Sequence, residues 1–479
     1  MIPESTLKTF FGFQDFRHGQ KEIVDSILSG KDTLALLPTG GGKSICFQVP
    51  GLIMKNLSLV VSPLISLMID QVHNLQKRNI PTSCIHSGLD KEQLKKIFSE
   101  ILSNKYKFVY VSPERLANDK FLRLCQQITI SQLVIDEAHC ISMWGNDFRP
   151  SYKRIPEFVS KLENRPVMSA FTATATRKVV NDIASSLQLN KPAIFYNSFS
   201  RKNLNICVYR CASHNQKILA LIYLLQKHFG QSGIIYTATR EDTKQVVDIV
   251  RKFSWNEKLS KIKIEYYHGA LSAERRKKVQ ELFLCKKLQV ISTTNAFGMG
   301  IDQPDIRFII HYQIPGNLEN YYQEIGRAGR DGNDSRCYLL FFPYDVTIQQ
   351  EMINSNKKIT IARKNYLFNQ LKQMIYYAEN KQCLHRFILK YFGEHSTANC
   401  EIRCNHCTKE RHLKINFEQD SFPEITHNPS LNLPNLTEEQ LIYCQLLQPK
   451  KLEHFLTIPG IGAAWRQVWL SSSRENMVE

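Results

Sequence analysis

Three features that mark membrane, secreted or repetitive proteins are missing from this sequence. No run of about 18 apolar residues occurs in it, so a membrane-spanning helix is not expected. The first residues, Met1 to Ser5, lack the basic and then apolar order of a signal peptide. No short-period repeat or low-complexity tract is present. These absences favour a cytoplasmic globular protein without a membrane partner.

Acidic residues are scarce relative to basic ones. Of the 479 residues, 62 are Lys or Arg and 44 are Asp or Glu, which gives a formal net charge of +18. Such a cationic surface attracts polyanions, either nucleic acid or an acidic membrane. Charge alone leaves a merely basic soluble protein equally open. At roughly 100–200 residues per domain, the chain has room for two to four domains.

Short apolar runs alternate with longer amphipathic stretches, the pattern of buried parallel strands joined by crossover helices. The runs of the first half are Thr33–Leu37, Leu57–Ser62, Phe108–Val111, Leu133–Ile135 and Val167–Phe171. Those of the second half are Ile206–Arg210, Gly233–Tyr236, Ile262–Tyr267, Leu288–Ser292, Phe308–Tyr312 and Cys337–Phe342. We predict an α/β protein with two tandem parallel-sheet domains that divide near the polar stretch Ser198–Asn205.

The strongest local signal is a glycine-rich turn between an apolar strand and an apolar helix. Glycines without β-carbons let backbone N–H groups close around a phosphate. Lys43 would reach the β- and γ-phosphates, and the Ser44 hydroxyl would ligate Mg²⁺. Leu37 replaces the first glycine of the usual pattern, a position that many motor ATPases relax. The predicted nucleotide-binding residues of this loop are Thr39, Gly40, Gly41, Gly42, Lys43 and Ser44.

Two further charged groups complete a site for phosphoryl transfer. Asp136 and Glu137 follow an apolar run, so Asp136 is placed to hold Mg²⁺ through water and Glu137 to orient the attacking water. Arg327 and Arg330 are three residues apart and would share one face of a helix. An arginine delivered across a cleft would stabilise charge on the transferring phosphate. Each pair is weak evidence alone and gains its weight from the phosphate loop.

Four of the 13 cysteines lie close together near the C-terminus: Cys383, Cys400, Cys404 and Cys407. A C-x3-C-x2-C cluster with a fourth thiol upstream fits tetrahedral Zn²⁺ bound by thiolates. Four protein ligands leave no open position, so the predicted site is structural. His406 is a rival ligand, and unligated buried thiols are the alternative.

In this order, the motifs resemble those of superfamily 2 helicases, and more narrowly those of the RecQ family. The resemblance extends over residues 5–408 and is carried by residues 13–20, 62–72, 111–116, 136–150, 171–176, 296–302 and 321–332. It implies two RecA-like domains with ATP between them. The implied activity is that of an ATP-dependent 3′-to-5′ DNA helicase in repair and recombination. A DNA-stimulated translocase or annealing factor with weak unwinding is the alternative.

The resemblance also implies how the nucleotide is held. Gln20 would hydrogen-bond adenine, because a carboxamide pairs an acceptor with the N6 amine and a donor with N7. Phe13 and Arg17 would sandwich the ring. Gly298 and Asp302 would line the cleft from the second domain.

For DNA, the resemblance points to an aromatic-rich loop at Trp144, Phe148 and Arg149 that senses single strands and couples them to hydrolysis. Aromatic faces stack on bases without regard to sequence, at about 1–3 kcal/mol each. Without the motif, the two aromatic residues would be read as ordinary core. The other implied DNA-contacting or coupling residues are Pro63, Ser66, Arg115, His139, Thr172 and Thr174. Of these, Pro63, Ser66 and Arg115 would contact DNA phosphates, and such contacts carry no sequence information.

The expected domains are two RecA-like units at residues 1–200 and 201–345, a helical zinc-binding module at 346–408 and a linker at 409–435. Residues 436–479 are expected to form a short helical tail that resembles the end of an HRDC domain or a helix-hairpin-helix. A helical cap without a binding role is the alternative, and no full winged-helix domain is expected. We expect a monomer that binds single-stranded and tailed duplex DNA in the cytoplasm, at the nucleoid if the source is bacterial.

Overall fold

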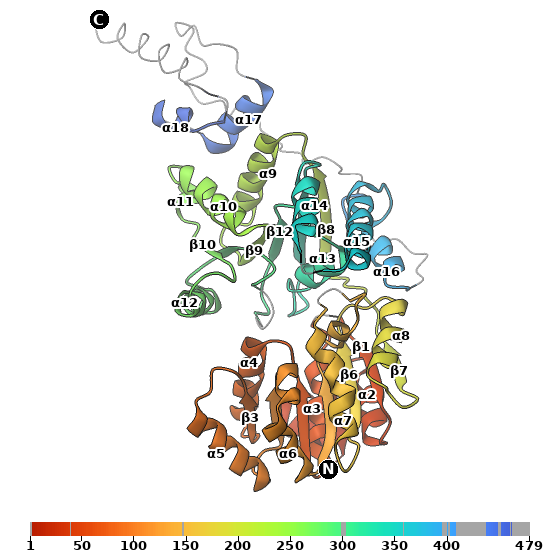
Figure 1. Cartoon of the computed structure of the whole chain (residues 1–479). Coiled ribbons are helices and arrows are strands. Elements are labelled where there is room, and N and C mark those ends of the chain that lie inside the picture. Colours follow the sequence, from red (N-terminus) through yellow and green to blue (C-terminus); the bar gives the residue numbers. More distant parts are fainter. Residues whose placement is uncertain are drawn as a thin grey trace, which may run out of the picture.

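The computed structural model describes residues 2–38, 40–145, 148–297, 303–357, 359–394, 400, 403–408, 437–448, 452–459 and 461. Two α/β domains follow each other along the chain, each built on its own sheet. Figure 1 shows the first domain, red to yellow, below the second domain, green to blue. The predicted fold class is confirmed: two parallel-sheet domains precede a helical region with clustered cysteines. None of the described helices is long and apolar enough to cross a membrane.

The first sheet has seven parallel strands in the order β3-β4-β2-β5-β6-β1-β7. Its strands are β1 Thr33–Leu36, β2 Leu57–Val61, β3 Thr82–Ile85, β4 Phe108–Val111, β5 Ile130–Ile135, β6 Val167–Thr172 and β7 Ala193–Tyr196. The central strands are buried on both faces, which explains their continuous apolar runs. The apolar runs predicted β1, β2, β4, β5 and β6, whereas the more polar β3 and the half-exposed edge strand β7 were missed.

Helices cover both sides of this sheet. They are α1 Pro3–Thr6, α2 Gln20–Leu28, α3 Lys43–Ile53, α4 Ile65–Gln76, α5 Lys91–Leu102, α6 Asp119–Gln126, α7 Ile155–Ser160 and α8 Arg177–Ser186. Helix α5 begins at a reciprocal pair of hydrogen bonds. The Asp90 side chain accepts from the backbone N–H of Gln93, and the Gln93 side chain accepts from the backbone N–H of Asp90. Such a capping box satisfies N–H groups that the first turn leaves open.

The second sheet has six parallel strands in the order β10-β11-β9-β12-β13-β8. Its strands are β8 Leu204–Arg210, β9 Gly233–Tyr236, β10 Ile264–Tyr267, β11 Val290–Thr293, β12 Phe308–His311 and β13 Ser335–Phe341. Its helices are α9 His214–Lys227, α10 Arg240–Lys252, α11 Glu257–Ser260, α12 Ala273–Leu284 and α13 Leu318–Ile325. At Gly233, a β-carbon would come within 2.1 Å of the Phe308 ring, so the close packing of β9 on β12 requires glycine there.

A helical region with the clustered cysteines extends the second sheet at its β8 edge. Its helices are α14 Asp345–Ser355, α15 Ile361–Glu379 and α16 Leu384–Tyr391. The Ile206 N–H donates to the Arg403 carbonyl at 3.0 Å, and the Asn405 N–H returns a bond to Ile206 at 3.2 Å. The Asn405 side chain adds bonds to both backbone groups of Val208. The cysteine-bearing segment therefore pairs with β8 as a short extra strand would.

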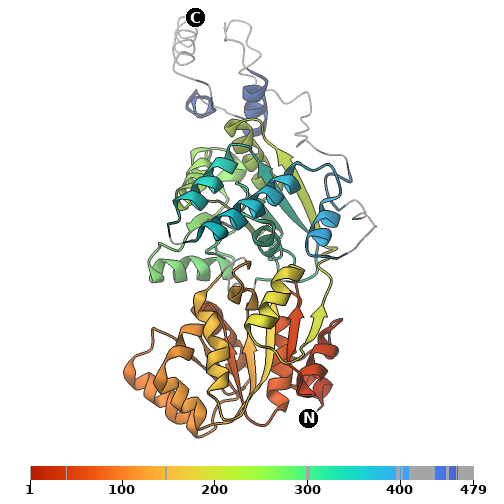
Figure 2. The same cartoon turned by 45° about the vertical axis from the view of Figure 1, so that its right-hand side comes forward.

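The described part of the tail packs on the second domain. Its helices are α17 Glu438–Leu447 and α18 Leu452–Leu456, which lie at the end of that domain remote from the first domain (Figure 2). Tyr443, Leu447 and Ile458 are buried in the same apolar cluster as residues of α9 and α10. The predicted linker 409–435 and residues 462–479 lie outside the described residues, as does Gly460 of the predicted glycine turn.

Candidate functional site between the two domains

A cavity of about 890 Å³ lies between the domains and is lined by residues of both. Most of the residues predicted to bind nucleotide or to act on it border this cavity: Phe13, Arg17, Gln20, Gly40, Gly42, Lys43, Ser44, Asp136, Glu137, Arg327 and Arg330. The structure thus brings together groups that lie almost 320 positions apart between Phe13 and Arg330. Thr39, Gly298 and Asp302, also predicted to bind nucleotide, lie outside the described residues.

The phosphate loop has the backbone that glycine makes possible. Gly40 and Gly42 have φ of 82° and 76°, in the left-handed region, and α3 begins at Lys43. A β-carbon on Gly42 would lie 2.4 Å from Gln20 Nε2. The Gln20 amide donates to the carbonyls of Gly41 and Gly42, at 3.1 and 3.2 Å. In this structure the carboxamide predicted for adenine therefore holds the phosphate loop.

Arg17 also contacts the loop. Its Nη1 donates to the Gly40 carbonyl at 2.6 Å, and its backbone N–H donates to Gln20 Oε1 at 2.9 Å. Phe13, the other residue predicted to sandwich adenine, lines the same cavity with 49% of its surface exposed. An exposed aromatic ring at a cavity has a flat face available for stacking.

Lys43 and the two carboxylates form one charged group on the floor of the cavity. Lys43 Nζ lies 3.0 Å from Glu137 Oε1. Burial lowers the pKa of Lys43, but the charges of Glu137 and Asp136 outweigh it and hold that pKa above its ordinary value. Burial and the neighbouring Glu137 raise the pKa of Asp136. The carboxylate of Asp136 and the hydroxyl of Ser44 border one cavity, and such hard oxygen ligands suit Mg²⁺.

The two arginines lie in a turn rather than on a helix. Helix α13 ends at Ile325, and Gly329 in the turn has a φ of 57°. The prediction that Arg327 and Arg330 share one helix face is therefore wrong, because the glycine-rich sequence ends the helix before them. Both still line the cavity, and the Cγ of Arg330 lies 3.6 Å from where a β-carbon on Gly40 would stand. Arg330 and Lys43 thus face the same space.

A chain of hydrogen bonds crosses from the carboxylate motif to the second domain. His139 Nδ1 lies 2.9 Å from Thr172 Oγ1, and Thr172 Oγ1 accepts from the Thr174 N–H at 3.3 Å. Thr174 Oγ1 in turn accepts from Gln323 Nε2 of α13 at 2.8 Å. His139, Thr172 and Thr174 are all buried.

The aromatic-rich loop is held between two partners. Lys178 Nζ sits 3.6 Å from the centre of the Trp144 ring, and Tyr366 packs edge-on against that ring at 5.4 Å. The Tyr366 hydroxyl donates to the Trp144 carbonyl. Arg363 donates to the carbonyls of Met143 and Gly145. Helix α15 therefore grips the backbone of the loop at three consecutive residues.

The remaining predicted DNA-contacting residues lie near this loop in the first domain. Arg149 Nη1 donates to the carbonyl of buried Pro63 at 2.6 Å, which connects two of these residues. Phe148 lies under Lys153, with Nζ 5.4 Å from the ring centre. Ser66 is exposed in the first turn of α4, and Arg115 is half-buried in a short 3₁₀ helix.

The four predicted zinc ligands form one cluster. The Sγ atoms of Cys383, Cys400, Cys404 and Cys407 all lie within 4.8 Å of one another. Tetrahedral zinc with Zn–S bonds of about 2.3 Å needs sulfurs roughly 3.8 Å apart, so the cluster fits that metal. The rival ligand His406 instead places its Nδ1 3.0 Å from the Gln382 carbonyl.

Reasoning from sequence missed four side chains at this site: Gln323, Arg363, Tyr366 and Arg201. Gln323 lies inside the segment 321–332 that carried the resemblance, so the sequence could have indicated it as a site residue. Arg363 and Tyr366 lie on a helix whose sequence pattern indicates only that it is helical. Arg201 lies in a polar stretch that served to divide the domains.

Fold and cavity together define a helicase-type ATPase with tandem RecA-like domains. Residues 17–183 match the DEAD/DEAH box helicase family and residues 216–332 the helicase conserved C-terminal domain. Residues 343–408 match the RecQ zinc-binding family. Solved structures share the fold: Mss116p bound to single-stranded RNA and AMP-PNP has a TM-score of 0.61 at 19% identity, over 75% of this chain and 76% of that one. The helicase MrfA bound to DNA has a TM-score of 0.60 at 15% identity, over 82% and 59%.

The particular family follows from closer relatives. The ATP-dependent DNA helicase RecQ of Bacillus subtilis is 40% identical over 409 residues, which are 85% of this chain and 67% of that protein. A protein of Acanthamoeba polyphaga mimivirus, whose name describes an ATP-dependent RNA helicase, is 40% identical over 99% of this chain and 86% of its own length. This chain belongs to the RecQ family of helicases. It spans 42% of the RecQ-like DNA helicase blm-1 of Caenorhabditis elegans, at 38% identity.

Proposed function

We propose that this chain is an ATP-dependent DNA helicase that moves 3′ to 5′ along single-stranded DNA and separates duplex in repair and recombination. The cavity between the two sheets carries the proposal, because Lys43 and Glu137 line one wall and Arg330 stands opposite. ATP whose γ-phosphate is contacted from both domains favours closure of the domains, and hydrolysis of that ATP allows them to separate. Repeated closure and release moves a motor along a strand.

Each charged group has a proposed task in hydrolysis. Lys43 and the phosphate-loop glycines hold the β- and γ-phosphates, and Glu137 orients the attacking water and takes its proton. Ser44 and Asp136 hold Mg²⁺, which neutralises charge on the phosphates when bound. Arg327 and Arg330 stabilise the charge that develops on the transferring phosphate. Phe13, Arg17 and Gln20 hold adenine, a task for which the Gln20 amide must leave the phosphate-loop carbonyls that it contacts here.

DNA is proposed to bind along the first domain beside the aromatic-rich loop. Trp144 and Phe148 offer faces for stacking, and Ser66 and Arg115 contact phosphates. His139, Thr172 and Thr174 transmit nucleotide state to that surface. Zn²⁺ on the four cysteines has a structural role, because four thiolates leave no open ligand position. We propose a monomer that acts in the cytoplasm.

Two alternatives differ from this proposal, one in whether the duplex is unwound and the other in whether the substrate is DNA or RNA. A translocase or annealing factor would hydrolyse ATP on DNA but unwind poorly. The name of the mimivirus relative describes an RNA helicase, which makes RNA the substrate to compare. The net charge of +18 suits either nucleic acid. DNA is favoured because several relatives, including the Bacillus subtilis protein, are named as DNA helicases.

A 3′-tailed duplex separates these functions. With purified protein, ATP hydrolysis should rise strongly with single-stranded DNA, and a 3′-tailed duplex should unwind where a 5′-tailed duplex does not. Lys43→Ala should lose hydrolysis by roughly 10² or more, since it removes a charge aimed at the phosphates. Lys55→Ala, which changes an exposed lysine of the same domain, is the matched control. Hydrolysis that ignores DNA, or that responds only to an RNA strand of the same sequence, would contradict the proposal.

A further inference from the structure

A short connector joins the two sheets, and its Arg201 side chain approaches the phosphate loop at Gly40. The connector comprises residues 197–203, between the end of β7 and the start of β8. Arg201 in this connector donates to three carbonyls of the turn that follows α13. Its Nη2 lies 3.0 Å from the Ala328 carbonyl and 3.1 Å from that of Gly329, and its Nη1 lies 3.3 Å from that of Gly326. One guanidinium thus holds the backbone on both sides of Arg327. The turn, residues 326–334, is named the arginine loop here.

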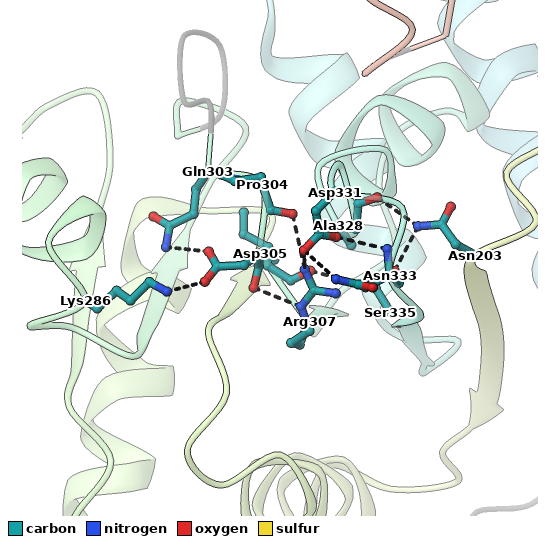
Figure 3. Close-up of polar contacts among 12 residues, drawn as sticks. Asn203, Lys286, Gln303, Pro304, Asp305, Arg307, Ala328, Asp331, Asn333 and Ser335 are labelled. Atoms are coloured by element: carbon teal, nitrogen blue, oxygen red, sulfur yellow. Dashed lines mark hydrogen bonds and ion pairs between the residues drawn. The ribbon is translucent and has the colours of Figure 1, made fainter. Parts of the chain in front are cut away.

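Asn203 also binds the arginine loop, and Arg201 and Asn203 together are called its seat. Its Nδ2 donates to the carbonyls of Gly329 and Asn333, at 2.8 and 2.9 Å, and its own carbonyl accepts from the Ser335 N–H at 2.9 Å (Figure 3). Gly329 must be glycine for two reasons. Its φ is positive, and a β-carbon there would lie 2.4 Å from Asn203 Nδ2. Side chains of the connector therefore donate hydrogen bonds to four backbone carbonyls of the arginine loop.

A second anchor for the arginine loop lies within the second domain. Arg307 pairs with Asp331, and Arg307 Nη2 also donates to the Pro304 carbonyl at 3.2 Å (Figure 3). The Gly329 N–H donates to the Ile306 carbonyl at 3.0 Å. Arg307 directly precedes β12, so this anchor belongs to the second domain. The connector is the anchor that lies between the domains.

The connector is also bonded to the first domain. The Asn197 N–H donates to the Leu36 carbonyl at 3.0 Å, and Asn197 Nδ2 donates to the His18 carbonyl at 2.9 Å. Arg201 Nη1 itself lies 3.6 Å from where a β-carbon on Gly40 would stand. The arginine loop, its seat and the phosphate loop therefore meet at one place.

We propose that Arg201 and Asn203 are positioning residues, which set the arginine loop against the phosphate loop and so link the relative movement of the domains to the placement of Arg330. The inference rests on the proposed ATPase, because Arg330 has no phosphate to meet otherwise. Arg201 acts through the loop backbone, which its fork of parallel N–H donors fits better than an ammonium would.

Four variants test the seat. Arg201→Ala and Asn203→Ala remove donors, Arg201→Lys keeps charge but loses the fork, and Lys202→Ala changes the exposed neighbour. With saturating single-stranded DNA, we expect kcat to fall roughly tenfold to hundredfold in Arg201→Ala. That is less than the roughly 10³-fold or greater effect of a transition-state arginine itself. Affinity for ADP should stay near that of the wild type, whereas affinity for ADP with aluminium fluoride should fall with kcat. Lys202→Ala should resemble wild type in every measurement.

A mutant cycle in a protein that carries both Arg327→Ala and Arg330→Ala tests whether Arg201 acts through these two arginines. If Arg201 acts through the arginine loop, adding Arg201→Ala to that protein should lower kcat by less than about twofold, because both placed groups are already gone. Additive losses would overturn the proposal, as would Arg201→Ala behaving like Lys202→Ala. Thermal unfolding identifies misfolded variants. Should Arg201→Ala not fold, Arg201→Lys and Asn203→Ala carry the same cycle.

The proposed function can fail separately. Wild-type protein that binds ADP with aluminium fluoride but hydrolyses ATP without regard to DNA would contradict the helicase. The loss of affinity for that complex in Arg201→Ala would still report the seat. Conversely, a DNA-stimulated wild type with unchanged Arg201→Ala would leave the helicase standing and overturn the seat.

Discussion

Gln323 donates from Nε2 to Thr174 Oγ1 at 2.8 Å, and this bond joins the first domain to α13 of the second across the nucleotide cavity. Thr174 is buried and bonded through its N–H to Thr172, which also contacts His139. The carboxylate motif and helix α13, which precedes the arginine loop, are therefore connected by a series of hydrogen bonds that includes the Thr174 backbone. Separating the domains must break this series at the Gln323 bond.

Loss of that bond should weaken the coupling between DNA and hydrolysis. A neutral hydrogen bond contributes about 0.5–1.5 kcal/mol, so Thr174→Val should lower DNA-stimulated kcat by roughly twofold to tenfold. Thr174→Ser keeps the hydroxyl and should stay near wild type. Steady-state hydrolysis with and without single-stranded DNA gives both numbers. Equal rates for the Val and Ser variants would show that the bond has no part in coupling.

The grip of α15 on the aromatic-rich loop makes a second prediction. Arg363 and Tyr366 hold three consecutive carbonyls, so Arg363→Ala should release the loop and leave the Trp144 ring without a fixed position. We expect affinity for single-stranded DNA and the DNA stimulation of hydrolysis to fall by roughly fivefold, about one net hydrogen bond. Hydrolysis without DNA should not change. Fluorescence anisotropy of labelled DNA and steady-state hydrolysis measure these effects.

Tyr366→Phe isolates one bond of this grip, because it keeps the ring against Trp144 and removes only the hydroxyl. Its effect should be smaller than that of Arg363→Ala. Tyr376→Phe, on the exposed side of the same helix, is the control and should have no effect. If the Arg363 and Tyr376 variants bind DNA equally well, the loop does not depend on α15.

The cysteine cluster should stabilise the edge of the second sheet. Cys404→Ala removes a ligand from the cluster, so we expect loss of bound zinc and a lower Tm, because metal-binding free energy is folding free energy. Cys285→Ala changes an exposed cysteine outside the cluster and should keep both. Metal analysis and thermal unfolding provide the measurements. A Cys404→Ala protein with full zinc content would assign the metal to other ligands.

Asn405 connects that cluster to β8. Its side chain bonds to the N–H and the carbonyl of Val208, so Asn405→Ala leaves two buried backbone groups without these partners. Each such group costs about 1–3 kcal/mol. The variant should therefore unfold more easily while still binding zinc, which separates the β8 contact from the metal. Unchanged stability in urea would contradict this role.

Sequence reasoning reached the fold because buried parallel strands have a signature of their own. The runs around Phe108–Val111 and Gly233–Tyr236 became strands at the predicted residues. Strand β3, at Thr82–Ile85, was missed because its polar residues give no continuous apolar run, and edge strand β7 was missed because it is only half-buried. Periodicity reports burial, and strands at a sheet edge are the least buried.

At the site, sequence identified chemistry better than it identified geometry. The group around Lys43 was predicted because phosphate binding requires glycine, lysine and carboxylate at fixed spacings. The helix expected at Arg327 and Arg330 is a turn, since Gly329 takes a left-handed backbone that spacing alone does not show. Contacts such as Arg201 with the arginine loop join residues more than 120 positions apart. Only the tertiary fold brings such partners together.

The tail supplies the last prediction, because its described helices are buried against the second domain. Tyr443 is 0% exposed, stacks on Phe253 with ring centres 6.3 Å apart and donates its hydroxyl to the Asn215 carbonyl at 2.6 Å. Trp255 stacks on His454 at 4.5 Å. These contacts pack the described part of the tail against the second domain. Removing a buried aromatic side chain costs about 3–5 kcal/mol, so Tyr443→Ala should destabilise that domain by this amount.

Tyr443→Phe separates packing from hydrogen bonding in the same position. It keeps the ring and loses only the bond to the Asn215 carbonyl, so its cost should be about 0.5–1.5 kcal/mol. If the tail is a cap, both variants should bind single-stranded DNA like wild type at temperatures where they remain folded. Urea unfolding and DNA binding, measured on the same samples, decide whether the tail is a cap or a DNA-binding element. Weaker DNA binding by a fully folded Tyr443→Ala protein would instead assign the tail a part in holding DNA.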